Sequence, residues 1–202
     1  MGRYSIELNI TGQRVLVVGL GRVGRRKVEG LFAAGAQVVG VDPIASWQAP
    51  PAITVLVEPY QPEHLTGVAL AFAAATLEVN RQVVADAKKR GIWVNSASEP
   101  EGGDFVIPAS WRDGPITLSV STGGASPALA VALRDQVALA LGRAPGLLAT
   151  VLAELRAEAL VMIPDPDRRR QVLSSWDDPK WLKLAQTSDP ESLRAKLRES
   201  FS

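Results

Sequence analysis

The sequence predicts an α/β fold: a doubly wound parallel sheet, then a short hairpin and helix, then an all-helical C-terminal part. Three observations support this prediction. A continuous apolar run, Val15 to Val18, is short and rich in β-branched residues, as in a strand buried on both faces. A glycine-rich turn follows it at once. Beyond Gly102 the pattern changes to two strands around a tight turn, and then to helical segments separated by prolines.

The glycine-rich turn reads Gly19-Leu20-Gly21-Arg22-Val23-Gly24, which is the GxGxxG spacing of a dinucleotide-binding turn. Its glycines permit a tight turn, a close backbone approach to a pyrophosphate and a close helix–strand contact. Apolar residues then recur at helical spacing as far as Gly35, and a second apolar strand, Gln37 to Val41, ends at Asp42. This unit predicts a Rossmann-type domain that binds a dinucleotide. The alternative is a glycine-rich turn in a cofactor-free α/β domain.

Asp42 bears on the choice of cofactor. A carboxylate at this position accepts hydrogen bonds from ribose hydroxyls and repels a 2′-phosphate, so the sequence favours NAD over NADP. The nearby Arg22, Arg25 and Arg26 have the opposite tendency, because they attract phosphate. The predicted cofactor contacts come from the turn and from the strand ends beside it: Gly19, Leu20, Gly21, Arg22, Val23, Gly24, Asp42, Pro43, Ile44 and Thr76.

Further strands complete the predicted sheet. Tyr4 to Leu8 alternates in polarity and is predicted to be a short edge strand. The remaining elements are strands at Ile53 to Val57, Val68 to Ala75 and Ile92 to Val94, and a helix at Val79 to Arg90. The sheet would therefore have six strands. Thr76 lies at the carboxyl end of one of them, where open α/β sheets bind ligands.

The rest of the chain is predicted to contain one hairpin and five helices. Phe105 to Trp111 and Ile116 to Val120 would pair as antiparallel strands. Ser126 is a suitable N-cap, and Pro127 a suitable first residue, for the helix that follows. The helices are predicted at Ala128 to Leu141, Leu147 to Val161, Asp167 to Leu173, Pro179 to Ala185 and Pro190 to Arg198. The predicted domains are 1–103, 104–142 and 143–202.

The composition excludes several classes of chemistry. The 202 residues include no cysteine and one histidine, His64, which excludes disulfides, thiol nucleophiles and Cys/His zinc sites. No metal site is predicted, and His64 is expected to be solvated and without a role. With 22 basic and 21 acidic residues, the net charge gives no argument for nucleic-acid or membrane binding. There is no apolar leader and no uncharged apolar run of about 18 residues, so we expect a cytoplasmic protein.

Four motifs together resemble the precorrin-2 dehydrogenase/sirohydrochlorin ferrochelatase family, the NAD-binding half of siroheme synthases. They are VLVVGLGRVGRRKVEGLFAAGAQV, AATLEVNRQVVADAKKRGIWVN, GGDFVIPA and STGGASPALA, and the last is the most discriminating. The resemblance implies NAD-dependent oxidation of precorrin-2 to sirohydrochlorin, followed in some members by insertion of Fe²⁺. It also implies a homodimer, with residues 104–142 as the dimerisation region.

The resemblance implies a substrate-binding function for the STGGASP loop. Precorrin-2 is a polycarboxylate, so anion sites are expected along its cleft. Backbone N–H groups at a helix N-terminus form such a site, and the predicted substrate contacts are Thr122, Gly123, Gly124 and Ser126. The simpler alternative is an ordinary capped helix start. Trp176 and Trp181 are interpreted as helical-domain core residues, with stacking against a flat tetrapyrrole as the alternative.

One departure from the family pattern concerns catalysis. Where the family has N-x-x-D-[D]-P, with the first aspartate as the expected acid/base, this chain reads Asn95-Ser96-Ala97-Ser98-Glu99-Pro100. Ser98 occupies the aspartate position and cannot act as a carboxylate base. Glu99 and Asp104 are the candidates to replace it, unless dehydrogenation needs only positioning and the proton leaves through water. We therefore predict dehydrogenase activity with weak or absent iron insertion.

A different class of function is also compatible with the sequence, namely a non-catalytic NAD-binding domain that senses a ligand and regulates another process. Such a regulator needs no second anion loop, whereas a tetrapyrrole enzyme has a use for STGGASP and for the helical C-terminal part. The run Arg168–Arg170 is expected to be a solvated helix face, and the near-neutral charge disfavours nucleic-acid binding. Turnover of precorrin-2 would separate the enzyme from the regulator.

Overall fold

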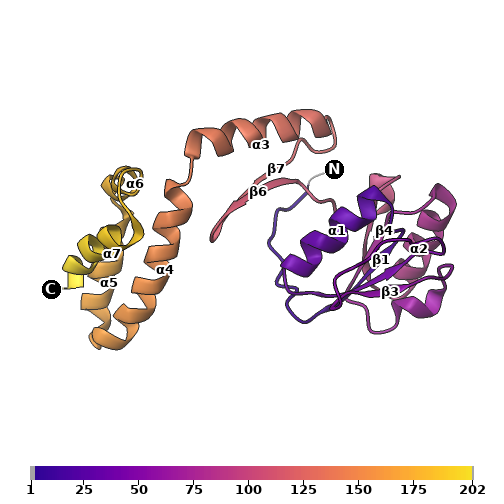
Figure 1. The fold of residues 1–202 in the computed structure, drawn as a ribbon, viewed down its shortest axis with the longest axis horizontal. Helices are drawn as coiled ribbons and strands as arrows, with labels where there is room; N and C mark the ends of the chain where they lie inside the picture. Colours follow the sequence, from indigo (N-terminus) through magenta and orange to yellow (C-terminus); the bar gives the residue numbers. More distant parts are fainter. Residues whose placement is uncertain (1–2, 202) are drawn as a thin grey trace. The chain divides into compact units, whose positions relative to one another are not determined.

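The computed structural model describes residues 3–201, which form two compact units (Figure 1). The first unit ends at Ile107 and the second begins at Pro108. The boundary lies close to the predicted end of the sheet domain. The finer division of the second unit into a dimerisation region and a helical domain stays a prediction.

The first unit contains the parallel sheet that the sequence predicts. Its strands are β1 (Arg14–Val18), β2 (Gln37–Val41), β3 (Thr54–Leu56), β4 (Leu70–Ala73) and β5 (Trp93–Ser96). Their order is β3-β2-β1-β4-β5, and every pair is parallel. The direction of winding reverses between β1 and β4, so the carboxyl ends of these two strands form the crevice in which open α/β sheets bind ligands.

The two faces of the sheet are covered by different helices. On one face, Val15 and Val17 belong to a core that includes Val28 and Leu31 of α1 (Arg22–Ala33). On the other face, Leu16 and Val18 belong to a core that includes Val83 and Ala87 of α2 (Leu77–Lys89). Successive side chains of a strand point to opposite faces, and this explains why β1 is apolar at every position from Val15 onwards.

The predicted edge strand at Tyr4 to Leu8 is wrong, and within residues 3–201 the parallel sheet has five strands instead of six. Every residue of this segment is exposed, so both of its sides face solvent; Tyr4 is 91% exposed and Ile6 is 52% exposed. Alternating polarity predicts a strand only when one face is buried, and here neither face is. The edge of β5 is instead partly occupied by Asp104, whose backbone N–H donates to Val94 O at 2.8 Å.

His64 has a local structural role, contrary to the expectation that it is merely solvated. It lies in the short 3₁₀ helix η1 (Pro62–Leu65), where its Nδ1 accepts from the backbone N–H of Gln61 at 3.0 Å. Its Nε2 lies 2.8 Å from Glu58 Oε1. The ring therefore fixes the connection between β3 and β4, and it lies outside the predicted cofactor contacts.

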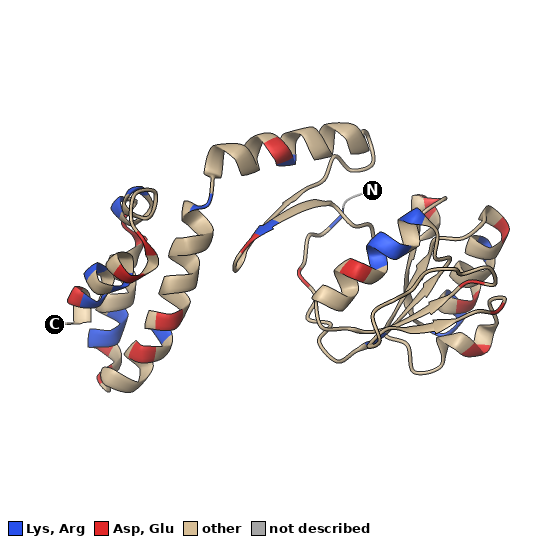
Figure 2. Ribbon diagram, in the orientation of Figure 1, with Lys and Arg blue, Asp and Glu red and all other residues tan. Residues whose placement is uncertain are grey.

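The second unit begins with the predicted hairpin, β6 (Ala109–Asp113) and β7 (Ile116–Val120), which pair as antiparallel strands. The first strand starts later than predicted, because Phe105 belongs to the first unit and packs edge-on against Phe72. Helix α3 (Pro127–Leu141) follows, and Ser126 Oγ accepts from Leu129 N at 3.2 Å, as expected of its N-cap. Figure 2 shows that α3 is almost free of charge, with Arg134 and Asp135 as the exceptions.

The remaining helices pack around one apolar core. They are α4 (Ala144–Met162), α5 (Pro166–Ser174), α6 (Lys180–Ala185) and α7 (Pro190–Arg198). Trp176 is buried in this core, and its Nε1 donates to Ser200 Oγ at 3.1 Å. Trp181 packs against the same core, and its Nε1 donates to Ser175 O at 3.0 Å. Both side chains therefore behave as core residues.

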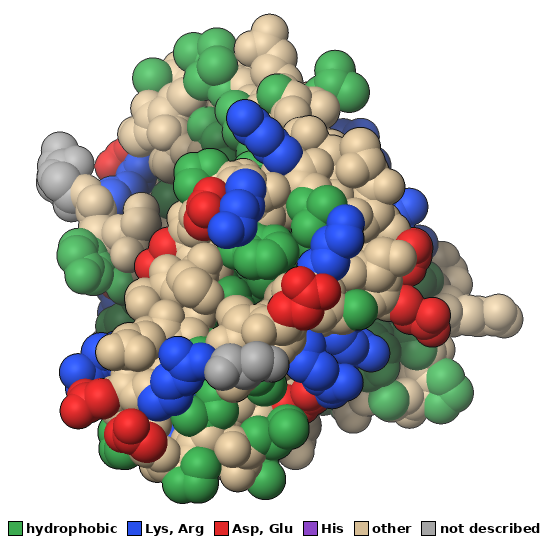
Figure 3. Space-filling model, turned by 90° about the vertical axis from the view of Figure 1, so that its left-hand side faces the viewer, with side chains coloured by type: hydrophobic (Ala, Val, Ile, Leu, Met, Phe, Trp, Pro, Cys, Tyr) green, Lys and Arg blue, Asp and Glu red, His purple; other side chains and the backbone are tan. Residues whose placement is uncertain are grey.

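The surface of the helical part carries charges of both signs, and Figure 3 shows them mixed over the visible face. Ion pairs join Arg194 to Glu154 and Arg198 to Glu158. Within residues 3–201, no single helix is long and apolar enough to cross a membrane. Helices α3 and α4 are long and apolar enough only when they are taken together, and they are bent by 68° to each other.

Candidate functional site

The glycine turn leaves β1 and starts α1, and two of its glycines are required by backbone packing. Gly19 has φ +91°, and a Cβ there would lie 2.5 Å from Ala74 O. A Cβ on Gly24 would overlap the carbonyl oxygen of Gly19. The turn is therefore held tightly between β1, α1 and the residue that follows β4, which is the close packing that a dinucleotide-binding turn needs.

Gly21 has the opposite character, because a Cβ there would meet nothing within 4 Å. It is the N-cap residue of α1, and no side chain caps the helix. The backbone N–H groups of the first turn are thus open toward this side, where the helix dipole also favours an anion. Space beside Gly21 and uncapped N–H groups fit a pyrophosphate, so the turn fits a dinucleotide.

Arginines gather at the start of α1 (Figure 2). Arg25 contacts both the turn and the loop after β2: its Nε donates to Leu20 O at 2.7 Å, and its guanidinium carbon lies 5.8 Å from the ring centroid of Trp47. This side chain therefore braces the turn against the loop after β2. Arg22 and Arg26 are exposed.

Asp42 joins the turn to the loop after β2. Its Oδ2 accepts from Leu20 N at 2.7 Å, and its Oδ1 accepts from Ile44 N at 2.9 Å. Each carboxylate oxygen has two lone pairs, so each keeps capacity to accept a ribose hydroxyl. The same carboxylate can thus shape the turn and bind a cofactor.

Asn80 organises the crevice at the carboxyl end of β4. This asparagine is buried in α2, where its Oδ1 accepts from Ala75 N at 2.8 Å and its Nδ2 donates to Ala75 O at 3.2 Å. The same Nδ2 donates to Ser98 Oγ at 2.9 Å. Ser98 is thereby held beside the carboxyl end of β4. Thr76, which follows Ala75, caps α2 through a 3.5 Å hydrogen bond from Val79 N.

Glu99 and Asp104 are both engaged by neighbours. Arg81 makes two hydrogen bonds to the Glu99 carboxylate, at 2.8 and 2.6 Å. These hydrogen bonds lower the pKa of the Glu99 carboxyl, which weakens it as a proton acceptor. Asp104 Oδ2 accepts from Val94 N at 2.9 Å, so Asp104 secures the chain along the edge of β5.

The STGGASP loop lies in the second unit and is organised by its own hydroxyl groups. Thr122 Oγ1 accepts from Ser126 N and donates to Ser126 O, each at 3.0 Å. Gly123 and Gly124 have φ +66° and +97°, so the loop turns through two left-handed residues. A Cβ on Gly123 would meet nothing within 4 Å, which leaves its backbone open to a ligand.

Comparison with known proteins decides the family. A family model described as "Putative NAD(P)-binding" matches residues 6–109, and one described as "Sirohaem biosynthesis protein central" matches residues 113–138. The chain belongs to the siroheme synthase N-terminal family. This confirms the resemblance seen in the sequence motifs, and the matched regions include both the glycine turn and the STGGASP loop.

Curated siroheme synthases are similar to the chain over most of its length. The protein of Gluconacetobacter diazotrophicus is 35% identical over 187 residues, which are 88% of this chain and 39% of that protein. Those of Nitrosomonas europaea and Chromobacterium violaceum are 37% and 32% identical, over 84% and 97% of this chain. These alignments cover 37% and 43% of the two relatives, so the chain spans roughly two fifths of the proteins that it matches.

A solved structure shows the same fold. "SirC, precorrin-2 dehydrogenase" superposes with a TM-score of 0.77 over 98% of this chain and 100% of that chain, at 24% identity. The fold expected for a siroheme synthase N-terminal region, a parallel sheet followed by a hairpin and a helical part, is thus confirmed. An NAD(P)-binding domain is likewise present.

Several residues of the site in this family member were not predicted from the sequence. Asn80 and Arg81 donate hydrogen bonds to Ser98 and Glu99. Asn95 donates to Phe105 O, and Lys27 donates to Asn95 Oδ1. One signal was available, since Asn80 shares the buried face of α2 with Val83 and Ala87, where an apolar residue is the rule. The contacts themselves join residues far apart in the chain.

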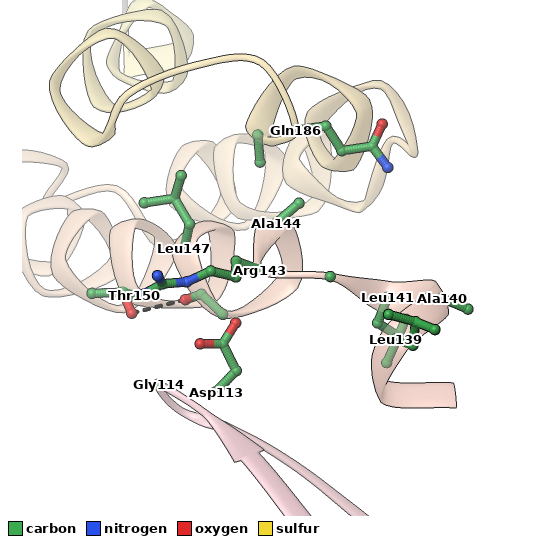
Figure 4. Close-up of a pocket in the computed structure, with 13 residues that line it drawn as sticks. Asp113, Gly114, Leu139, Ala140, Leu141, Arg143, Ala144, Leu147, Thr150 and Gln186 are labelled. Atoms are coloured by element: carbon green, nitrogen blue, oxygen red, sulfur yellow. Dashed lines mark hydrogen bonds between the residues drawn. The ribbon is translucent and has the colours of Figure 1, made fainter. Parts of the chain in front are cut away.

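A hollow of about 710 Å³ lies in the second unit between the hairpin turn and the start of α4 (Figure 4). Asp113 and Arg143 are its charged lining residues. Asp113 Oδ2 is buried without a hydrogen-bond partner, close to the backbone of Gly146 in the first turn of α4, where the helix dipole favours a carboxylate. The hollow contains none of the predicted cofactor, substrate or catalytic residues.

Proposed function

We propose that this chain is an NAD-dependent precorrin-2 dehydrogenase that oxidises precorrin-2 to sirohydrochlorin. The observation that carries the proposal is the crevice at the reversal point of the sheet. There, an open Gly21, the uncapped start of α1 and the carboxylate of Asp42 offer a dinucleotide site beside Ser98 and Thr76. Membership of the siroheme synthase N-terminal family supplies the substrate.

The reaction removes a hydride and a proton from precorrin-2. NAD, when bound, supplies the hydride acceptor. The glycine turn would hold the pyrophosphate through its backbone N–H groups, and Asp42 would hold the ribose through its remaining lone pairs. Gly123 offers open backbone to substrate carboxylates, while Gly124, Thr122 and Ser126 shape that loop. Neither Glu99 nor Asp104 is needed as a base if water carries the proton away.

The deciding experiment combines the purified protein with precorrin-2 and NAD, and follows NADH and sirohydrochlorin by absorbance. Formation of both products in equal amounts is expected. Addition of Fe²⁺ then tests metal insertion, with siroheme as the readout. NAD binding without turnover of precorrin-2 would favour the alternative, a non-catalytic NAD-binding regulator.

Asp42→Ala is expected to lower the affinity for NAD more than that for NADP. The variant loses the acceptor for the ribose hydroxyls and the charge that repels a 2′-phosphate. Affinity for NAD should fall about tenfold or more, because a hydrogen bond to a charged group contributes about 1.5–3 kcal/mol. Affinity for NADP should change less, although the turn also loses the acceptor for Leu20 N.

Titration calorimetry with both cofactors measures this difference. Glu29→Ala removes a carboxylate from an exposed position of α1 and serves as the control. A native protein that prefers NADP, or equal losses for both cofactors in Asp42→Ala, would overturn the role proposed for Asp42.

We also propose that two chains assemble through the hairpin and α3. Only Ala130 of this helix is buried, and its large exposed apolar residues are Leu129, Val131, Leu133, Val137 and Leu139. A two-stranded hairpin is marginal alone, and its open edges favour pairing with another strand. A two-fold partner would cover both the strand edges and the apolar helix.

Leu133→Asp is therefore expected to convert a dimer into a monomer, because the interface would bury an uncompensated charge. Multi-angle light scattering measures the mass of both proteins. Val161→Asp, an exposed apolar position at the end of α4, is the matched control and should leave the dimer intact. A native protein that is monomeric at micromolar concentration would contradict the proposed assembly.

A further inference from the structure

Lys27 is the one partly buried lysine among the described residues of the first unit, and the proposed reaction does not use it. It lies in α1, and its Nζ donates to Asn95 Oδ1 at 2.8 Å and lies 5.3 Å from the ring centre of Phe72. No carboxylate within residues 3–201 forms an ion pair with it. Burial, with the nearby charge of Arg26, lowers the pKa of Lys27 from 10.5 to about 8. This desolvation costs free energy, which a fully exposed lysine at the surface of α1 would not lose.

The partner of this ammonium is itself buried. Asn95, in β5, is 4% exposed, and its Nδ2 donates to Phe105 O at 2.9 Å. The ring of Phe105 meets that of Phe72 edge-on, with centroids 5.4 Å apart. Lys27, Asn95, Phe105 and Phe72 thus form a closed cluster that joins α1 to β5, to the segment after β5 and to β4.

The segment between Asn95 and Phe105 carries all three proposed catalytic residues, Ser98, Glu99 and Asp104. Its side toward α2 is fixed by the bonds from Asn80 and Arg81. Its two ends are joined by one hydrogen bond, because the side-chain Nδ2 of Asn95 donates to the backbone oxygen of Phe105. Lys27 is the donor that satisfies the oxygen of this amide. An apolar side chain at position 27 would leave that buried oxygen without a donor and the amide without a defined orientation.

We propose that Lys27 is a positioning residue for the dehydrogenation. Through Asn95 it fixes the segment 96–105 relative to α1, the helix whose first turn forms the dinucleotide site. This inference rests on the proposed function for its kinetic consequence. The physical coupling between α1 and segment 96–105 is independent of turnover.

The test uses the full chain with Lys27→Met, Lys27→Arg and Asn95→Leu. In Lys27→Met, amide hydrogen exchange should rise in segment 96–105 and stay native in β1 and β4. The kcat should fall ~10- to 100-fold, because segment 96–105 follows β5 at the carboxyl edge of the sheet and its backbone shapes the crevice where NAD and substrate must meet. This loss comes from misplacement of the reacting groups and does not require any side chain of the segment to act as a base. The Kd for NAD should stay native, because Lys27 lies beyond the turn that binds it. Lys27→Arg, which keeps a donor for Asn95, should recover most of the kcat.

Further comparisons make the result decisive. Lys88→Met, at an exposed position of α2, should match the native protein in every measurement. Lys27→Met combined with Asn95→Leu should lose no more kcat than either change alone, because both break one network. Native exchange in segment 96–105 of Lys27→Met would overturn the proposal, as would a loss confined to NAD affinity. If the native protein turns over no precorrin-2, the proposed function fails, and the exchange data still decide whether Lys27 positions the segment.

Discussion

Replacing Gly24 with alanine is expected to abolish NAD binding. The added methyl group would overlap the carbonyl group of Gly19. This carbonyl cannot withdraw, because Gly19 directly follows β1 and its backbone is held there. The turn must therefore open, and its N–H groups no longer converge on a pyrophosphate. Losing two hydrogen bonds to a charged group, at about 1.5–3 kcal/mol each, lowers NAD affinity by more than about 100-fold.

Two other glycines of α1 and its turn separate this effect from a general loss of folding. Gly21→Ala adds a methyl group that meets nothing within 4 Å, at a residue with φ −67°, so the Tm should stay native while NAD affinity falls. Gly30→Ala lies in the same helix with equally open surroundings, and should bind NAD normally with a gain of about 0.5–1 kcal/mol in stability. Native NAD affinity in both Gly24→Ala and Gly21→Ala, measured by calorimetry, would show that the dinucleotide binds elsewhere.

The parallel sheet could be predicted because strands buried on both faces leave continuous apolar runs, as at Val15 to Val18. The same logic failed for Tyr4 to Leu8, whose alternation reports a possible strand but not whether a sheet edge is available to pair with it. The hairpin begins later than predicted, at Ala109 instead of Phe105, for a related reason. Phe105 continues an apolar stretch into the hairpin, yet its ring packs on Phe72 of the first unit, a contact that no local pattern contains.

The candidate site divides in the same way. The glycine turn and Asp42 could be predicted because their requirements are local: a left-handed residue, a close approach and a carboxylate at a strand end. The residues that hold Ser98 and its segment could not, because Asn80 and Ser98 are 18 residues apart and Lys27 and Asn95 are 68 apart. Only folding brings such pairs together. A polar residue on the apolar face of a predicted helix, as at Asn80, is the sign of such a contact that the sequence contains.

Ser98→Asp is expected to increase iron insertion by ~10²–10⁴-fold, the usual contribution of a general acid or base. Metal insertion must remove two pyrrole protons, and the native chain has a hydroxyl group at the position that the family resemblance assigns to a carboxylate. Ser98 Oγ now accepts from Asn80 Nδ2 at 2.9 Å. One oxygen of an introduced carboxylate can take over that hydrogen bond, which leaves the other oxygen to accept a proton. The rate of siroheme formation from sirohydrochlorin and Fe²⁺ measures the gain.

Ser98→Asn is the matched control, because it has the same shape as aspartate but does not ionise at neutral pH, and its iron insertion should stay at the native level. Dehydrogenation should respond differently, since it can rely on an oriented NAD and on water: Ser98→Ala should leave it largely unchanged. Glu99→Gln or Asp104→Asn should lower it only if one of these residues removes the proton, and the bidentate contact of Glu99 with Arg81 argues against Glu99. Robust iron insertion by the native protein, insensitive to changes at Ser98, Glu99 and Asp104, would place the acid/base group outside segment 96–105.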